Sequence, residues 1–279
     1  IFEYMKIAIL GSGGREHSLA LQISKSKKLQ KLYCIPGNAG TSMVAENINI
    51  DIKNFKKIHE FLKIKNVDLV IVGPEKPLVD GIADFLKKKN IKVFGPNKNV
   101  AKLEGSKTFT KKICEQYKIP TAKFGILKNK KDALNYLDSS KFPIVIKADG
   151  LASGKGVYIC YDLKSSKNAV KEIFNGKFGK AEKLLIEEFL EGEEMSFFVI
   201  SDGNSFKNFN TAQDHKRVNE GDTGKNTGGM GAYSPSSLIN IELESKIINR
   251  IIKPTLKALN EIGENYIGFL CAGLMIKDN

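Results

Sequence analysis

The segment VIKADGLASGKGV, residues 145–157, decides how this sequence is interpreted. An apolar run reaches Lys147 and three glycines follow, which is typical of a glycine-rich loop beside phosphate groups. A P-loop has the pattern G-x-x-x-x-G-K followed by Ser or Thr. Gly150 and Gly154 are too close together for that pattern, and a glycine follows Lys155. We therefore predict a flexible cover that closes over a nucleotide, not a P-loop.

The composition is that of a soluble globular protein, with 279 residues, 42% hydrophobic and 27% charged. No apolar run approaches the roughly 20 residues that span a bilayer. The first residues lack the layout of a signal peptide, although the origin of residues 1–4 stays open. We therefore predict a cytoplasmic protein without a membrane partner.

The net charge of +13 raises nucleic acid as a possible partner. Only Arg15, Arg217 and Arg250 are arginines among the 44 basic residues. Because surfaces that bind nucleic acid favour arginine for bidentate contacts, we predict no nucleic-acid partner. A basic field still attracts small anionic substrates.

The four cysteines lie far apart and are not arranged as metal ligands. Cys34, Cys114, Cys160 and Cys271 form no C-x-x-C pair and have no nearby histidine. This spacing predicts reduced, mostly buried thiols and argues against a zinc site or a disulfide framework.

The first hundred residues alternate between strand-like and helix-like segments. Continuous apolar strands that alternate with helices predict a parallel sheet covered on both faces, with ligands at the carboxyl ends of the strands. The strands are expected at 6–10, 31–35, 68–73 and 92–95, and the helices at 16–26 and 78–89. Three glycine-containing loops follow strands: 11–17, 36–40 and 73–78.

Gly11-Ser12-Gly13 begins the fingerprint of a dinucleotide-binding domain, but Glu16 stands where the third glycine belongs. No convincing acidic residue follows at the end of a second strand. A lone G-x-G is weak evidence, so a Rossmann oxidoreductase is the poorest alternative. We favour a phosphate or another polar ligand at the helix N-terminus.

From Glu104 onward the pattern changes to a mixture of helices and strands of α+β character. Helices are expected at 106–118 and 131–140, and strands at 143–148, 157–161, 183–189 and 195–200. The predicted fold class is therefore α/β and α+β, with a domain boundary near residue 104.

Lysines and carboxylates in this second part form a nucleotide-binding pattern. Lys107 and Lys147 can neutralise phosphates as point charges. The segment IEEFL can present main-chain groups to an adenine edge, and the carboxylate of Glu194 can accept hydrogen bonds from ribose hydroxyls. Each feature is weak by itself, but their order and spacing together are specific.

This order resembles that of the ATP-grasp ligases, and most closely that of the phosphoribosylamine–glycine ligase (glycinamide ribonucleotide synthetase) family. The resemblance runs along the whole chain, and QDHKR followed by TGGMGAYSP is particular to this family. The matching segments are GSGGREH, PGNAGT, IVGPEKPLVDGI, FGP, LEGSK, IVIKADGLASGKGV, IEEFLEGEEMSF, QDHKR, DTGKNTGGMGAYSP and GFLCAGLM.

The resemblance implies an N-terminal parallel-sheet (pre-ATP-grasp) substrate domain at 1–104 and an ATP-grasp domain at 105–279 that is incomplete at its C-terminus. A mobile lid subdomain is expected at about 122–189. The implied reaction uses ATP, with Mg²⁺ or Mn²⁺, to join glycine to 5-phosphoribosylamine through glycyl phosphate, as in de novo purine biosynthesis. Such chemistry needs charge neutralisation and exclusion of water, and no protein nucleophile.

The resemblance also implies a role for individual residues. Lys107 and Lys147 would contact ATP phosphates, and the flap would contain Gly150, Ser153, Gly154, Lys155 and Gly156. The adenine and ribose would meet Glu187, Glu188, Phe189, Leu190 and Glu194. The reacting groups of the substrates would lie beside Asp214, His215, Lys216, Arg217, Gly228, Gly229, Met230 and Gly231. The phosphoribosylamine side is assigned to Gly11, Gly13, Gly14, Pro74 and Glu75. Lys147, Asp214 and Lys216 are the catalytic candidates.

One departure from the family concerns the metal. Relatives often place a first metal carboxylate near position 273, where this sequence has Gly273, and the remaining ligands are expected beyond Asn279. We therefore predict no metal ligand among these residues. We expect an N-terminal fragment or a truncated reading frame that has no measurable ligase turnover by itself.

Two alternatives remain beside this interpretation. In the first alternative, the chain is a different ATP-grasp carboxylate–amine ligase or carboxylase. In the second, it is a nucleotide-binding module without catalysis. We expect small-molecule partners and a monomer or weak homo-oligomer. The preferred metal and any domains fused downstream stay open.

Overall fold

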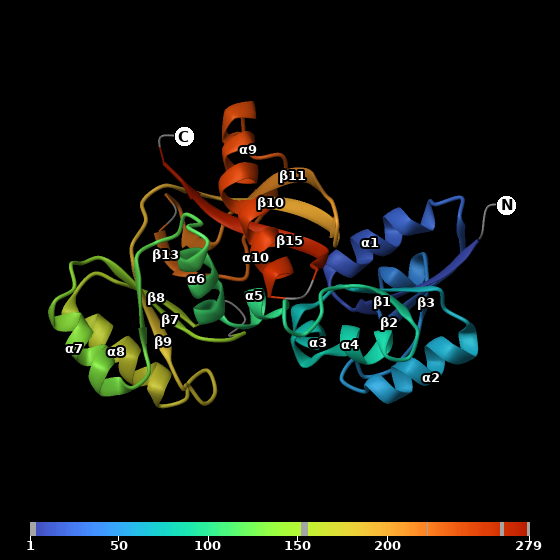
Figure 1. The fold of residues 1–279 in the computed structure, drawn as a ribbon, viewed down its shortest axis with the longest axis horizontal. Helices are drawn as coiled ribbons and strands as arrows, with labels where there is room; N and C mark the ends of the chain where they lie inside the picture. The colour runs from blue at the N-terminus through green and yellow to red at the C-terminus, as the bar shows by residue number, and fades with distance from the viewer. Residues whose placement is uncertain (1–3, 152–155, 222, 263–264, 278–279) are drawn as a thin grey trace. The chain divides into compact units, whose positions relative to one another are not determined.

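Figure 1 shows the computed structural model of the chain, which describes residues 4–151, 156–221, 223–262 and 265–277, without the side chains of Lys225 and Asn226. The chain divides into two compact units. The first unit contains Ile1–Lys102, Asp202–Asn204 and Glu264–Gly268, and the second contains Leu103–Ser201, Ser205–Gly263 and Phe269–Asn279.

The first unit is built on a five-stranded parallel sheet with the strand order β3-β2-β1-β4-β5. The strand order reverses between β1 and β4, which is where open parallel sheets bind ligands. The strands are β1 (Met5–Gly11), β2 (Leu29–Pro36), β3 (Glu46–Asn47), β4 (Leu69–Val72) and β5 (Lys92–Phe94). The helices are α1 (Gly14–Ser24), the 3₁₀ turn η1 (Thr41–Met43), α2 (Phe55–Lys65), α3 (Glu75–Asp80) and α4 (Ile82–Lys87).

Both faces of this sheet are covered by helices, because alternate residues of each apolar strand point to opposite sides. Leu10 of β1 packs in one core cluster with Ile58 of α2 and Ile82 of α4. Ile9 of β1 packs in another cluster with Ala20 of α1. The arrangement leaves the loops after β1 and β4 open for a ligand.

The helix predicted at 78–89 is two short helices instead of one. Gly81 separates α3 from α4 with a φ of +97°, in the left-handed region that glycine adopts without strain. The apolar periodicity on both sides of Gly81 is continuous, so it concealed the break.

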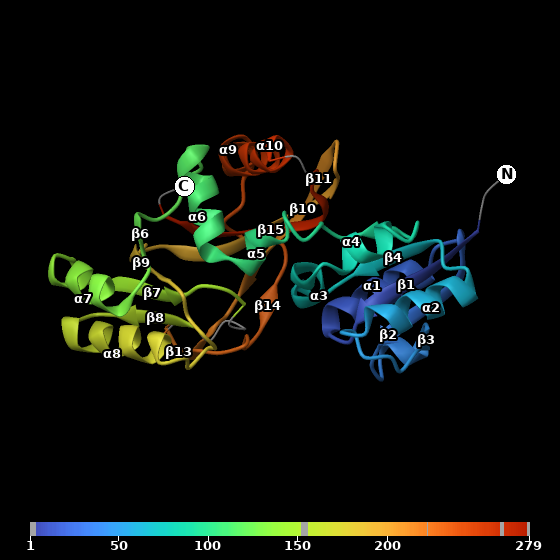
Figure 2. The same ribbon diagram turned by 60° about the horizontal axis from the view of Figure 1, so that its bottom comes forward.

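The second unit contains a four-stranded antiparallel sheet with the order β6-β9-β7-β8. Its strands are β6 (Phe124–Leu127), β7 (Ile144–Ala148), β8 (Val157–Cys160) and β9 (Leu184–Glu188), and its helices are α7 (Lys130–Asp138) and α8 (Leu163–Phe174). The two helices lie side by side on one face of the sheet (Figure 2) and share its core with Ile146 and Ile186. The opposite face of β7 and β9 is therefore available for polar side chains.

A second four-stranded sheet of this unit has the order β14-β11-β10-β15. Met195, Phe197 and Val199 alternate from β10 into a core with Leu243 and Ile247 of α9. The strands are β10 (Glu193–Asp202), β11 (Phe206–Asp214), β14 (Ala232–Tyr233) and β15 (Ile267–Ile276), and a hairpin is formed by β12 (Arg217–Asn219) and β13 (Thr223–Asn226). The remaining helices are α5 (Lys102–Gly105), α6 (Lys107–Gln116), α9 (Ile241–Ile247), the π turn η2 (Ile248–Ile252) and α10 (Lys253–Glu261).

The predicted order of a parallel sheet followed by an α+β region is confirmed. The helix α8 and the continuous run from α9 to α10 were not predicted from the sequence. Within the described parts of the chain, no helix combines the length and the apolar character that a membrane crossing requires.

Candidate functional site

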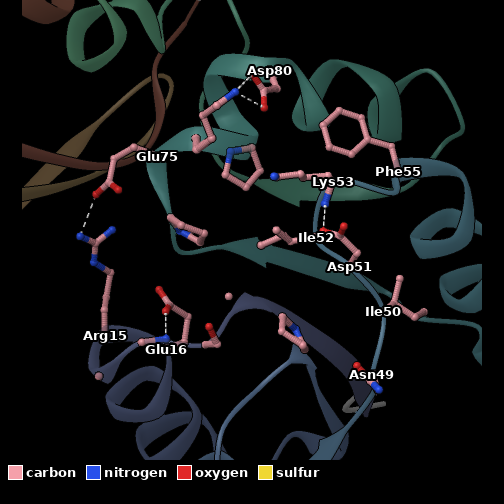
Figure 3. A pocket seen from close by; sticks show the side chains of 18 residues that line it. Arg15, Glu16, Asn49, Ile50, Asp51, Ile52, Lys53, Phe55, Glu75 and Asp80 are labelled. Atoms are coloured by element: carbon pink, nitrogen blue, oxygen red, sulfur yellow. Dashed lines mark hydrogen bonds and ion pairs between the residues drawn. The ribbon is translucent and has the colours of Figure 1, made fainter. Parts of the chain in front are cut away.

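A cavity of about 720 Å³ lies in the first unit at the carboxyl ends of β1 and β4 (Figure 3). All of the residues assigned to the phosphoribosylamine side line it: Gly11, Gly13, Gly14, Pro74 and Glu75. The segment 49–53 and Phe55 form another part of the wall, which the sequence analysis did not predict. The switch point of the parallel sheet is thus a hollow bordered by glycine loops.

Glu16 lines this cavity and holds the loop after β1 in place. Its side chain is buried, and its carboxylate accepts a hydrogen bond from the main-chain N–H of Gly13 at 2.6 Å. A Cβ atom on Gly73 would lie 1.9 Å from Oε1 of Glu16, so the loop after β4 approaches this carboxylate without room for a side chain. Glu16 therefore fills the place where the dinucleotide fingerprint requires glycine.

Arg15 is a pocket residue that the sequence analysis did not single out. Its guanidinium donates hydrogen bonds to the carbonyl of Gly73 at 2.5 Å and to the carboxylate of Glu75 at 2.8 Å. Figure 3 shows the contact with Glu75. Both side chains are about half exposed, so their ion pair contributes little stability and an anionic ligand can replace it. A signal existed in the sequence, since arginine is rare in this lysine-rich chain.

In the second unit, Glu187 joins two lysines. Its Oε2 lies 2.9 Å from Nζ of Lys147 and 3.2 Å from Nζ of Lys111. Lys147 lies on β7 and Glu187 on β9, two neighbouring strands of the same sheet. The structure therefore brings the predicted phosphate lysine and the predicted adenine segment together, and it adds Lys111, which was not predicted.

Lys107 lies at the first position of α6, after Ser106 as the N-terminal cap. Its Nζ donates to the carbonyl of Gly150 at 2.7 Å, so the predicted phosphate lysine meets the start of the predicted flap. Burial lowers the pKa of Lys107, and the charge of Asp149 opposes that shift. A partly desolvated ammonium at a helix N-terminus is suited to an anionic ligand.

Asp149 anchors the glycine segment to this helix. Its carboxylate accepts hydrogen bonds from the main-chain N–H and the hydroxyl of Thr108, both at 3.0 Å, and pairs with Lys183 at 3.2 Å. Burial acts to raise the pKa of Asp149, but the hydrogen bonds from Thr108 and Lys183 outweigh it and the pKa is lowered. The sequence carried a signal here too, because an aspartate separates Lys147 from the glycines.

The predicted adenine segment divides at the end of β9. The main chain of Glu187 pairs with β6 and β7, and the side chain of Glu188 accepts from the N–H of Lys123 at 2.7 Å. Phe189 and Leu190 follow the strand and lie outside its ladder. Their main chain is therefore the better placed part of this segment for an adenine edge.

The segments QDHKR and TGGMG lie against each other. The N–H of His215 bonds to the carbonyl of Gly231 at 2.9 Å, the N–H of Met230 to the carbonyl of His215 at 2.7 Å, and the N–H of Thr227 to the carbonyl of Lys216 at 2.7 Å. Arg217 donates to the carbonyl of Gly224 at 3.1 Å. The predicted substrate residues on both segments, Asp214, His215, Lys216, Arg217, Gly228, Gly229, Met230 and Gly231, thus belong to one local structure.

Glu194 forms an ion pair with Lys216, whose Nζ also lies 3.8 Å from the carboxylate of Asp214. The ribose candidate and two catalytic candidates are therefore adjacent. All three side chains are between 33% and 40% exposed, so solvent reaches them.

Three predicted flap residues, Ser153, Gly154 and Lys155, lie outside the described residues. Gly156 is described and buried, and its carbonyl accepts from the N–H of Ala148 at 2.8 Å. In the residues that the structure describes, no cluster of three or more His, Cys, Asp and Glu side chains is arranged to hold a metal ion. We derive no chemical step through a metal ion.

Two family models match the chain. The model described as phosphoribosylglycinamide synthetase, N domain, matches residues 5–104, and the one described as phosphoribosylglycinamide synthetase, ATP-grasp (A) domain, matches residues 105–279.

Curated relatives agree with these matches. The chain is 50% identical over 275 residues to a phosphoribosylamine–glycine ligase of Mesorhizobium japonicum, covering 98% of this chain and 65% of that protein. It is 48% identical over 273 residues to the enzyme of the same name from Brucella melitensis, covering 98% and 64%. The chain thus spans about 65% of the length of these relatives.

A solved structure is similar as well. The crystal structure of phosphoribosylamine–glycine ligase from Thermotoga maritima has a TM-score of 0.82 and 32% identity, over 98% of this chain and 66% of that one. On the two family models and on the identity to the relatives, this chain belongs to the phosphoribosylglycinamide synthetase family, of which it carries the N domain and the ATP-grasp (A) domain.

Proposed function

We propose that this chain supplies the nucleotide-binding and substrate-binding residues of an ATP-dependent ligase. The reaction joins glycine to 5-phosphoribosylamine and gives glycinamide ribonucleotide, ADP and phosphate, a step of de novo purine biosynthesis. The observation that carries the proposal is that Lys107 meets the start of the glycine segment at Gly150 while Lys147 pairs with Glu187 of the predicted adenine segment, in a chain of this family. The names of the relatives supply the substrates.

In the first proposed step, a carboxylate oxygen of glycine attacks the γ-phosphorus of ATP, and the bond to the bridging oxygen breaks so that ADP leaves. The negative charge on the phosphates is the main obstacle, and Lys107 and Lys147 would neutralise it. The segment from Gly150 to Gly156 would then cover the glycyl phosphate, because an exposed acyl phosphate reacts with water.

In the second step, the amine nitrogen of 5-phosphoribosylamine attacks the acyl carbon, phosphate leaves and the amine loses a proton. Nζ of Lys216 lies 3.8 Å from Oδ1 of Asp214. These two side chains are our candidates for the groups beside the reacting atoms. The cavity of the first unit is proposed to hold the phosphoribosyl group, with Arg15 available to its phosphate. Catalysis would then consist of positioning and charge neutralisation.

We also propose the finer assignments that follow from the family. The substrate domain would cover 1–104 and the ATP-grasp domain 105–279, with a lid at about 122–189. Mg²⁺ or Mn²⁺ would accompany ATP. The described cysteines are free thiols, which supports a cytoplasmic protein, with small molecules as partners and a monomeric or weakly associated state.

The proposal is tested by ADP release from the protein as its gene encodes it. ADP is measured with glycine and 5-phosphoribosylamine together, with each alone, and with bicarbonate or formate in place of glycine. We expect rapid release only when both substrates are present. Release that depends on bicarbonate or formate would assign the chain to another carboxylate-activating ligase. ATP binding without any release would assign it to a non-catalytic nucleotide-binding module.

A further inference from the structure

Lys111 is a buried charged residue to which the proposed chemistry gives no role. It lies on α6, one turn after Lys107, and its side chain is 11% exposed. Burial lowers the pKa of Lys111, and the charge of Glu187 opposes that shift. A lysine buried to this degree is rare without a partner that compensates its charge.

Lys111 is held in place by contacts on several sides. Its Nζ donates to the hydroxyl of Thr121 at 2.6 Å and to the carbonyl of Ala122 at 3.4 Å, and it lies 5.5 Å from the centre of the Phe124 ring. Together with the ion pair to Glu187, these contacts join α6 to the chain before β6 and to β9. The ammonium of Lys111 is therefore fixed relative to the sheet.

The side chain of Lys147 has fewer contacts than that of Lys111. It shares Oε2 of Glu187 with Lys111, but its side chain is 27% exposed, and Glu187 is the partner that the described residues provide for its Nζ. An ammonium has three donors and a flexible stem, so Lys147 can turn toward a phosphate. Of the two lysines, Lys147 is the one that can move.

Movement of Lys147 has a consequence for Glu187, whose side chain is 5% exposed. A buried carboxylate that loses its only cation is strongly destabilised. With Lys111 in place, Glu187 keeps a fixed cation when Lys147 turns to the nucleotide. Without Lys111, each phosphate contact of Lys147 would leave the carboxylate of Glu187 without either of its two ion-pair partners, with only the charge of Lys107 acting on it from farther away.

We propose that Lys111 is a positioning residue of the ATP site: it retains the carboxylate of Glu187 and so allows Lys147 to transfer to the phosphates. This inference rests on the proposed function, because it assumes that ATP binds beside Lys147. Lys111 itself touches no part of the nucleotide in this account.

The test is calorimetric titration of ATP into the protein as its gene encodes it. Lys111→Met is expected to raise the Kd for ATP about tenfold or more. The substitution removes the ion pair of Lys111 with Glu187, which corresponds to at least one charged contact. Lys112→Met is the matched control, because Lys112 is the next residue of α6 and is exposed. It should leave the Kd within about twofold of the unmodified chain.

Rescue by a second substitution separates this role from simple damage to the fold. Glu187→Gln removes the charge that Lys111 compensates, so the double variant Lys111→Met/Glu187→Gln should recover most of the affinity lost in Lys111→Met. The single variant Glu187→Gln completes a double-mutant cycle, which measures the coupling between the two side chains. Additive losses in the double variant would overturn the inference, as would a Lys111→Met variant that binds like Lys112→Met.

Reductive methylation of the unmodified chain gives a measurement that needs no variant. ATP should protect Lys147 from methylation, whereas Lys111 should stay unreactive with and without ATP. Methylation of Lys111 as fast as that of Lys112, or ATP protection of Lys111 with none of Lys147, would contradict the assigned roles. If the unmodified chain binds no ATP at all, the proposed function fails first.

Discussion

The glycine loops at 11–14 and at 227–231 look alike in sequence and differ in what surrounds them. In the first unit, a Cβ atom on Gly11 would lie 2.6 Å from Cγ of Glu16. In the second unit, a Cβ atom on Gly228 or Gly231 would meet nothing within 4 Å. Gly11 has no room for a side chain because the protein itself fills the space, whereas Gly228 and Gly231 have open space around them.

The difference teaches that glycine has two separate uses in this chain. Around the cavity of the first unit, glycine lets Glu16 and the strand ends pack into a preformed shape. In the loop 227–231, Gly229 has a φ of +114°, which favours glycine, but no neighbour within the described structure requires glycine at Gly228 or Gly231, where an approaching ligand is the remaining physical use. The predictions below test this contrast.

The largest effect is expected from Gly73→Ala, because the added methyl would lie 1.9 Å from Oε1 of the buried Glu16. Glu16 must then shift and lose its hydrogen bond to Gly13. We expect the free energy of unfolding to fall by about 2–3 kcal/mol. Thermal unfolding measures this, with Gly14→Ala as the control, since a Cβ there meets nothing within 4 Å. Equal unfolding temperatures for the two variants would remove the distinction between packed and open glycines.

Lys147→Ala should act on binding instead of folding. It removes a charged contact to the ATP phosphates worth about 1.5–3 kcal/mol, so the Kd for ATP should rise by at least about tenfold. The unfolding temperature should change little, because Glu187 keeps Lys111 as a partner. Lys112→Ala on the exposed side of α6 is the control, and ATP titration of both variants is the measurement. An unchanged Kd in Lys147→Ala would contradict the role of this lysine.

Gly228→Ala should reverse the result of Gly73→Ala. We expect its free energy of unfolding to stay within about 0.5 kcal/mol, because the methyl enters open space. We expect substrate-dependent ADP release to slow about tenfold, because the methyl keeps a reacting group from the main chain. A variant with full activity would show that this loop has glycine for a reason other than ligand approach.

The smallest effect is expected for Asp149, on the free energy of unfolding at acidic pH. Because its pKa is below the usual 3.8, its contribution to stability is fully present above pH 3.8 and is lost as the pH falls through the lowered pKa. Asp149→Asn should therefore be less stable than the unmodified chain at neutral pH. The gap should be a fraction of a kilocalorie per mole, because solvent screens the pair with Lys183, and it should narrow as the pH falls below 3.8. Urea unfolding at several pH values measures it, and a gap that widens toward acid would contradict the assignment.

The sequence predicted the parallel sheet well, because its strands are continuous apolar runs and the loops after them contain glycine. It did not predict the break at Gly81, since the apolar pattern is the same on both sides and only the backbone conformation differs. The helices α9 and α10 were missed as well, because the region was interpreted through its motifs and not through its periodicity.

For the candidate site, sequence order predicted which segments meet but not which side chains pair. The pairing of Lys147 with Glu187 depends on strand register, because Lys147 lies opposite Leu185 and Glu187 follows two residues later on the same face. Lys111 was not predicted, since a lysine in a lysine-rich helix looks like a surface residue until burial is known. Arg15 and Asp149 lay inside quoted motifs and were passed over in favour of their glycines.

The most direct test of the whole account follows an oxygen atom. Glycine labelled with oxygen-18 in its carboxylate is incubated with ATP, 5-phosphoribosylamine and the protein as its gene encodes it, and the phosphate released is analysed by mass spectrometry. If glycine is activated as an acyl phosphate, one labelled oxygen passes from its carboxylate to each phosphate formed. Phosphate without the label, released at the same rate as glycinamide ribonucleotide, would contradict the mechanism proposed for this chain.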